Sequence, residues 1–157
     1  MSTQPTVFYL HTGYVGAAPW ERILGTDPPY GVQRWSALTE TASFVLYPPL
    51  GRLVRLGGTA TFRLWLRGSA SGIAIINATL VEITDEGRAL HVCGVEAPVL
   101  VESSLKDEPY VFAVGPIIRT IAARSTLVLQ ILAKSTKSPV FLYWDDDRTP
   151  SQLAISF

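Results

Sequence analysis

Residues 59–66, T-A-T-F-R-L-W-L, decide the fold of this 157-residue chain. Because side chains alternate between the two faces of a β-strand, the stretch has one apolar and one mixed face. The apolar face holds Ala60, Phe62, Leu64 and Leu66. The mixed face holds Thr59, Thr61, Arg63 and Trp65. Gly57-Gly58 before it and the turn 68–72 after it favour chain reversals. We therefore predict the central strand of a β-sandwich, with Arg63 and Trp65 on its outer face.

The rest of the chain predicts further short strands and no amphipathic helix. Turn residues separate the other strand-like stretches, which are 6–11, 44–47, 53–56, 73–84, 89–95, 99–102, 110–118, 125–134, 140–144 and 153–157. Residues 12–50 are rich in proline and glycine, and we expect loops and edges there. This spacing is typical of an all-β sandwich of about 8–10 strands. We expect one domain over 1–157, with a loop-rich part at 1–58 and a strand-rich core at 59–157.

Two details of the strand pattern carry separate predictions. The loop Asp85-Glu86-Gly87-Arg88 predicts a short hairpin in which Gly87 has a positive φ. The last stretch, 153–157, alternates and has no polar tail after it. We expect it to be an unprotected edge strand in or near a contact with another chain.

The charge content indicates the class of partner. Thirteen basic and thirteen acidic residues give a formal net charge of zero, whereas a nucleic-acid binder normally carries a basic excess. Charged residues make up 17% of the chain and hydrophobic residues 48%. An ordinary soluble domain has about 25% charged residues, and low charge promotes association. We expect copies of the chain, or a larger protein assembly, to cover part of the surface.

Single residues and the N-terminus suggest the setting of the protein. Cys93 is the one cysteine, so it forms no internal disulfide, and we expect it to be buried and unreactive. One Asn, one Met and one Cys fit a thermophile, although the enrichment in Lys and Glu is missing. The first residues do not form a signal peptide, and no apolar run reaches the length of a membrane helix. We expect a virion or an extracellular surface as location, with synthesis in the cytoplasm and no classical export.

The order of the motifs resembles a known domain. L-W-L at 64–66, A-T-L-V-E-I-T at 78–84, D-E-G-R-A-L-H-V at 85–92, P-Y-V-F-A-V at 109–114 and T-L-V-L-Q-I at 126–131 are similar to the C-terminal jelly-roll domain of X-prolyl dipeptidyl-peptidase and cocaine-esterase type hydrolases. W-S-A-L at 35–38 and W-D-D-D-R-T-P-S-Q-L at 144–153 resemble β-sandwich modules of prokaryotic surface proteins. The resemblance implies a jelly-roll-like antiparallel sandwich. It implies no catalytic residue, because the triad of those hydrolases lies in a separate α/β domain.

The residues themselves provide no catalytic set. The turn 68–72, G-S-A-S-G, has Ala70 where a nucleophile elbow needs serine. His11 and His91 lie in strand-like stretches with no carboxylate at a telling spacing. We therefore expect a protein that is not an enzyme.

Two clusters remain as candidate binding sites. Asp145 and Asp147, in the run 145–147, offer hard oxygen ligands that could hold Ca²⁺ if the run is a loop, and otherwise form a solvated turn beside Arg148. The many tryptophans and tyrosines could stack on sugars or fill the core. We single out Trp65, Arg63 and Trp144 as binding residues.

Together these features predict a non-catalytic structural protein. We expect a self-associating or docking subunit of a virion, as capsid or decoration, or of a surface layer or filament. The alternative is a carbohydrate-binding module that uses exposed aromatic side chains.

Overall fold

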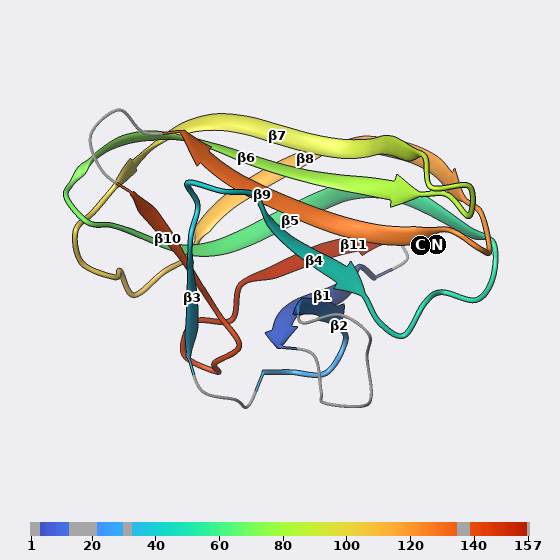
Figure 1. Cartoon of the computed structure of the whole chain (residues 1–157), viewed down its shortest axis with the longest axis horizontal. Coiled ribbons are helices and arrows are strands. Elements are labelled where there is room, and N and C mark those ends of the chain that lie inside the picture. Colours follow the sequence, from blue (N-terminus) through green and yellow to red (C-terminus); the bar gives the residue numbers. More distant parts are fainter. Residues whose placement is uncertain (1–3, 13–21, 30–32, 135–138, 157) are drawn as a thin grey trace.

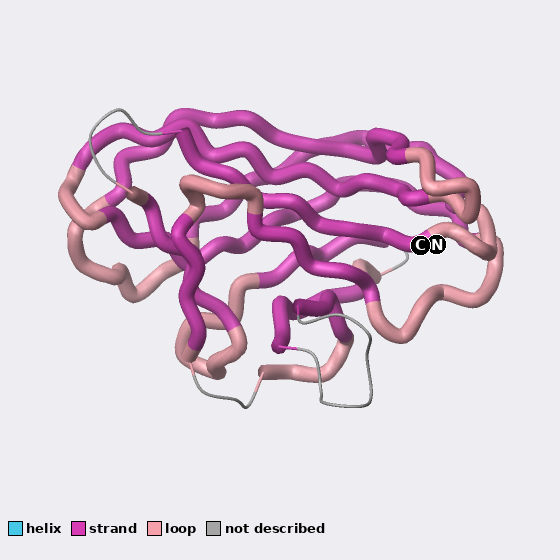
Figure 2. The backbone as a smooth tube through the Cα atoms, in the orientation of Figure 1, coloured by secondary structure: helices cyan, strands magenta, loops and turns pink. Residues whose placement is uncertain are grey.

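The computed structural model describes residues 4–12, 22–29, 33–134 and 139–156. This part of the chain consists of strands and loops without a helix, as Figures 1 and 2 show. The strands are β1 (Thr6–Thr12), β2 (Arg22–Gly25), β3 (Arg34–Ala37), β4 (Ala42–Leu46), β5 (Val54–Gly68), β6 (Gly72–Ile83), β7 (Ala89–Val101), β8 (Tyr110–Ile121), β9 (Thr126–Lys134), β10 (Val140–Trp144) and β11 (Gln152–Ser156). In these residues we find no helix with the length and apolar character needed to cross a membrane.

All the strands join one sheet that folds over on itself. The hydrogen-bonded order is β3-β10-β5-β11-β1-β2-β4-β9-β6-β7, and β8 pairs with β5 off this path. Adjacent strands are antiparallel except β2 and β4, which are parallel. Strands β4, β9, β6 and β7 form one layer, and β8, β5, β11 and β1 form the other (Figure 1). The predicted all-β sandwich is confirmed, and the buried apolar side chains of both layers form its core.

Strand β5 has the central place and the register that the sequence predicts. It pairs with β8 on one side, and with β11 and then β10 on the other. Its inner face is fully buried at Phe62, Leu64 and Leu66, whereas Arg63 is exposed and Trp65 is partly exposed. One detail differs from the prediction, because the strand does not begin after Gly58. That residue has φ +76° beside a register shift in the middle of β5, so the glycines form a bulge inside a longer strand.

The C-terminal strand corrects the predicted edge. Strand β11 lies between β5 and β1, so Leu153 pairs with Phe62 on one side and with Phe8 on the other. Its backbone is therefore paired within the molecule, and the prediction of an unprotected edge is wrong. An alternating apolar pattern shows which face of a strand is buried, but it does not show whether both edges have partners.

The early part of the chain contributes more structure than expected. Strands β2, β3 and β4 all lie within residues 12–50, where the sequence analysis found one short strand. Two of them are four residues long, too short for a clear alternation. The hairpin between β6 and β7 follows the prediction, because Gly87 has φ +86°.

Candidate functional site

A group of aromatic side chains lies on the outer face of β3, β10 and β5. Tyr143 on β10 pairs with Trp35 on β3 and with Trp65 on β5, and residues paired in this way point to the same side. Phe141, two residues before Tyr143, shares this face. Trp35 is 61% exposed, and the other three side chains are partly exposed. We call these four residues the aromatic row.

A ring–ring contact and the side chain of Arg67 hold the row in position. The rings of Trp35 and Phe141 are 5.3 Å apart between centroids and nearly perpendicular, at 89°. The guanidinium carbon of Arg67 lies 5.4 Å from the centroid of Phe141 and 5.9 Å from that of Tyr143. Its Nε also donates a 2.9 Å hydrogen bond to the hydroxyl of Tyr143. Such cation–π contacts contribute about 0.5–1 kcal/mol each at exposed sites.

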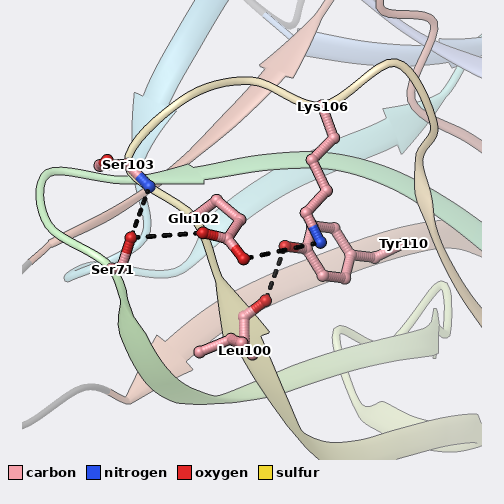
Figure 3. Close-up of polar contacts among 6 residues, drawn as sticks. All are labelled: Ser71, Leu100, Glu102, Ser103, Lys106 and Tyr110. Atoms are coloured by element: carbon pink, nitrogen blue, oxygen red, sulfur yellow. Dashed lines mark hydrogen bonds and ion pairs between the residues drawn. The ribbon is translucent and has the colours of Figure 1, made fainter.

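The loop after β7 supports Arg67 from the other side. Nη1 of Arg67 donates to the backbone carbonyl of Ser103 at 3.3 Å. Ser71 holds this loop, since its hydroxyl donates to Oε2 of Glu102 at 3.3 Å and accepts from the backbone N–H of Ser103 at 3.2 Å (Figure 3). Nζ of Lys106 lies 3.9 Å from Oε1 of the same glutamate. A network of polar side chains thus adjoins one end of the aromatic row.

The structure separates the residues that the sequence singled out for binding. Trp65 belongs to the aromatic row, and Arg63 lies two residues earlier on the same outer face. Trp144 is in the core, 4% exposed, so it does not reach this surface. Its ring packs edge to face against Phe44 at 5.1 Å, and its indole N–H donates to Oγ of Ser36 at 3.4 Å.

Of the row, the sequence singles out Trp65 alone as a binding residue. Trp35 and Tyr143 are among the tryptophans and tyrosines considered for sugar stacking, whereas Phe141 and the neighbouring Arg67 are not. Strand β10 reads V-F-L-Y-W, which is apolar on both faces, so nothing in it indicates which face is buried. The hydrogen-bonded pairing with β3 and β5 is the information that brings these side chains together.

Two residues of the acidic run 145–147 make separate polar contacts. Asp145, at φ +65°, directly follows β10, and its Oδ1 lies 3.0 Å from Nδ1 of His11. Asp146 accepts a 3.0 Å hydrogen bond from the backbone N–H of Arg148, and this bond is the main reason why the pKa of Asp146 lies below its usual value. Asp147 is exposed. Within the described residues, no three side chains of His, Cys, Asp or Glu are grouped closely enough to hold a metal ion.

His11 is buried and held on both sides. It is 4% exposed, and its Nε2 lies 2.6 Å from the backbone carbonyl oxygen of Asp27. Nδ1, the other ring nitrogen, lies 3.0 Å from Oδ1 of Asp145, so each nitrogen has a hydrogen-bond partner. This arrangement ties the loop after β2 to the end of β10. The other histidine, His91, is exposed on β7.

A buried carboxylate on β6 connects the two layers of the sandwich, because its partner Arg119 is on β8. Glu82 on β6 is 3% exposed, and its oxygens accept hydrogen bonds from Arg119 at 3.0 Å and from the backbone N–H of Ala122 at 3.2 Å. Burial acts to raise the pKa of Glu82. Hydrogen bonds from Ser125, Arg119 and Ala122, with the charge of Arg119, outweigh burial, so the pKa lies below its usual value.

Cys93 lies in the core, as the sequence predicts. It is 5% exposed, and burial raises the pKa of its thiol to about 11. A groove of about 390 Å³ between β7 and β8 runs past it, beside Gly94, Pro116 and Ile117.

Comparison with known proteins identifies the fold. No protein-family model and no curated protein sequence matches the chain. A CocE/NonD family hydrolase from Staphylococcus aureus matches with a TM-score of 0.72 and 13% identity, over 99% of this chain and 37% of that chain. An aminopeptidase from a marine sediment archaeon, Thaumarchaeota archaeon, matches with a TM-score of 0.70 and 12% identity, over 95% of this chain and 36% of that chain. An α-amino acid ester hydrolase matches with a TM-score of 0.64 and 14% identity, over 98% of this chain and 36% of that chain.

These matches confirm the resemblance that the motifs predict, at the level of fold. The chain spans little more than a third of the length of these proteins.

Proposed function

We propose that this chain is a non-catalytic structural subunit that associates with copies of itself. The observation that carries the proposal is an exposed aliphatic pair on neighbouring strands. Ile73 on β6 lies opposite Leu100 on β7, and their side chains are 68% and 55% exposed. Burying such side chains in a contact is favourable by about 25 cal/mol for each Å² of apolar surface.

The pair belongs to a larger apolar surface. Ile75 is opposite Pro98 in the next row of the same two strands, and Leu132 on β9, which pairs with Asn77 of β6, lies on the same outer face. We call these residues, with Ile73 and Leu100, the aliphatic face. Charged residues make up 17% of the whole chain, so the protein has few charges whose repulsion would keep two such faces apart.

Charges at the borders of the aliphatic face favour a second copy as the partner. Lys134 on β9 pairs with Ile75 from one side, and Glu96 on β7 pairs with Asn77 from the other. Both charged side chains are exposed. A two-fold axis through the middle of the face brings Lys134 of one copy toward Glu96 of the other, as in an isologous dimer. A stable contact of this kind buries roughly 1,200 Å² or more in total.

The surroundings of His11 support a role without catalysis. Both ring nitrogens of His11 are hydrogen-bonded, one to Asp145 and one to the backbone, so neither is directed at a hydroxyl nucleophile. In this proposal the subunit is a capsid or decoration protein of a virion, or part of a surface layer or filament. The similar solved structures support a modular use of the fold, because they contain it as about a third of a longer chain.

Light scattering of the purified protein over a wide concentration range tests the association. We expect a dimer or larger species, which Leu100→Glu converts to monomer. Ile118→Glu is the matched control, because Ile118 is 79% exposed on β8, outside the aliphatic face, and this variant should leave the assembly intact.

A charge exchange tests the two-fold arrangement. Lys134→Glu should weaken the assembly because it places like charges together, and the double variant Lys134→Glu/Glu96→Lys should restore it. A wild-type protein that stays monomeric at every concentration contradicts self-association. Equal effects of the substitutions at Leu100 and Ile118 would place the contact elsewhere.

A further inference from the structure

We propose that the aromatic row is a binding platform for an oligosaccharide. This inference goes beyond self-association, because the row lies on β3, β10 and β5, whereas the aliphatic face lies on β6, β7 and β9. The two surfaces can therefore be changed independently.

The spacing of the row fits a chain of sugar rings. Neighbouring strands in a sheet are about 4.8 Å apart. Trp35, Tyr143 and Trp65 occupy one register position on three adjacent strands, so the two tryptophans stand roughly 10 Å apart with the tyrosine between them. A surface of this length offers ring contacts to more than one linked sugar.

The chemistry of the row also suits a sugar. The axial C–H groups of a sugar ring form an apolar face that packs on an aromatic ring, while its hydroxyls need hydrogen-bonding partners. Arg67 and the hydroxyl of Tyr143 provide such groups beside the rings, held by their 2.9 Å hydrogen bond. A guanidinium has five N–H donors, and the bonds to Tyr143 and Ser103 involve two of its nitrogens. Polar groups fixed beside aromatic rings make the site preorganised.

The distribution of exposed apolar side chains favours a sugar over a protein as the ligand of the aromatic row. Every apolar member of the row is aromatic, whereas exposed aliphatic side chains such as Ile73, Leu100 and Ile118 lie on other strands. Tryptophan, tyrosine and arginine are also common at the centres of protein interfaces. The experiment therefore measures the oligomeric state together with binding.

Native gel electrophoresis in the presence of soluble polysaccharides tests the proposal. The probes are hydroxyethyl cellulose, laminarin and mannan, each compared with a gel lacking polysaccharide. We expect at least one of them to retard the wild-type protein. Trp35→Ala should weaken the retardation about tenfold or more, as judged from its dependence on polysaccharide concentration. Trp35 is largely exposed, so this variant should fold normally, which circular dichroism would check.

Matched variants separate the platform from the aliphatic face. Leu53→Ala removes another exposed apolar side chain, and Lys134→Glu alters the proposed dimer contact, so both should be retarded like the wild type. Arg67→Lys should weaken retardation, because lysine does not reproduce the guanidinium fork. Wild-type protein that runs freely with all three polysaccharides overturns the proposal. So does equal retardation of Trp35→Ala, or a Trp35→Ala variant that loses its oligomeric state and keeps its retardation.

Discussion

Nδ1 of His11 on β1 lies 3.0 Å from Oδ1 of Asp145 at the end of β10, although 134 positions separate the two residues in the chain. His11 is buried and Asp145 is half-buried, and a backbone carbonyl holds the other side of the imidazole ring. It connects parts of the molecule that strand pairing leaves apart, because β1 pairs with β2 and β11 and not with β10.

We expect His11→Ala to lower the free energy of unfolding by about 2 kcal/mol or more, because it removes two buried hydrogen bonds and the packing of the ring. Asp145→Asn should lower the free energy of unfolding by a smaller amount. Its side-chain oxygen still accepts from the ring, and asparagine tolerates the positive φ at this position. Urea denaturation of the three proteins measures these differences. A larger loss for Asp145→Asn than for His11→Ala would contradict this account of the pair.

Calcium binding at the acidic run is testable by thermal melting. Asp145 already contacts His11, and a cation bound to that carboxylate would have to compete with the ring. We therefore expect the same melting temperature in calcium and in chelator. A higher melting temperature in calcium would establish the ion as a ligand of the folded state, because such ligands stabilise by mass action. Loss of that increase in Asp147→Asn would then assign the site.

Glu82 makes stability depend on pH in the acidic range. Because its pKa is below the ordinary 4.5, the folded state holds the carboxylate more firmly than the unfolded chain does. Its contribution is fully present above pH 4.5 and is lost as the pH falls through the lower folded-state pKa. We expect Glu82→Gln to be about 2 kcal/mol less stable than the wild type at neutral pH. The difference should shrink on acidification.

Glu86→Gln serves as the control, since Glu86 is exposed in the β6–β7 hairpin and should have almost no effect at any pH. Denaturation at a series of pH values gives both curves. A difference between wild type and Glu82→Gln that grows toward acid pH would reverse the sign of the expected effect.

Cys93 should react slowly with thiol reagents in the folded protein. Burial raises the pKa of its thiol from 9.0 to about 11, which lowers the reactive thiolate fraction about 100-fold at neutral pH. Restricted access at 5% exposure slows the reaction further. Labelling with a chromogenic disulfide reagent, with and without denaturant, measures the ratio of rates. Equally fast labelling in both conditions would show that β7 opens readily at this position.

The sequence predicts those features of the fold that follow from the alternation of side chains within a single strand. Strand β5 has a sharp contrast between its faces, so its register, its buried Phe62 and its outer Trp65 follow from alternation. Strand β10 lacks that contrast, and this is why the sequence suggests Trp144 as a binding residue although it packs in the core.

Contacts between strands that are far apart in the sequence do not follow from the alternating pattern of any one strand. The aromatic row depends on the pairing of β3, β10 and β5, and the partner of His11 lies at the other end of the chain. The position of β11 between two strands was missed for the same reason, since each of its neighbours is far away in sequence. Such relationships depend on tertiary structure, which local propensity does not encode.

The neighbouring positions of β1 and β11 have a consequence for folding during synthesis. Thr6 pairs with Ile155, so one edge of β1 and one edge of β5 lack their partner until the ribosome has made β11. The two terminal strands, β1 and β11, lie side by side between β2 and β5 (Figure 1). Contacts between residues so distant in sequence form slowly, because a long loop must close first. The sheet can therefore close only after almost the whole domain has left the ribosome, and until then the nascent chain exposes unpaired strand edges to its surroundings.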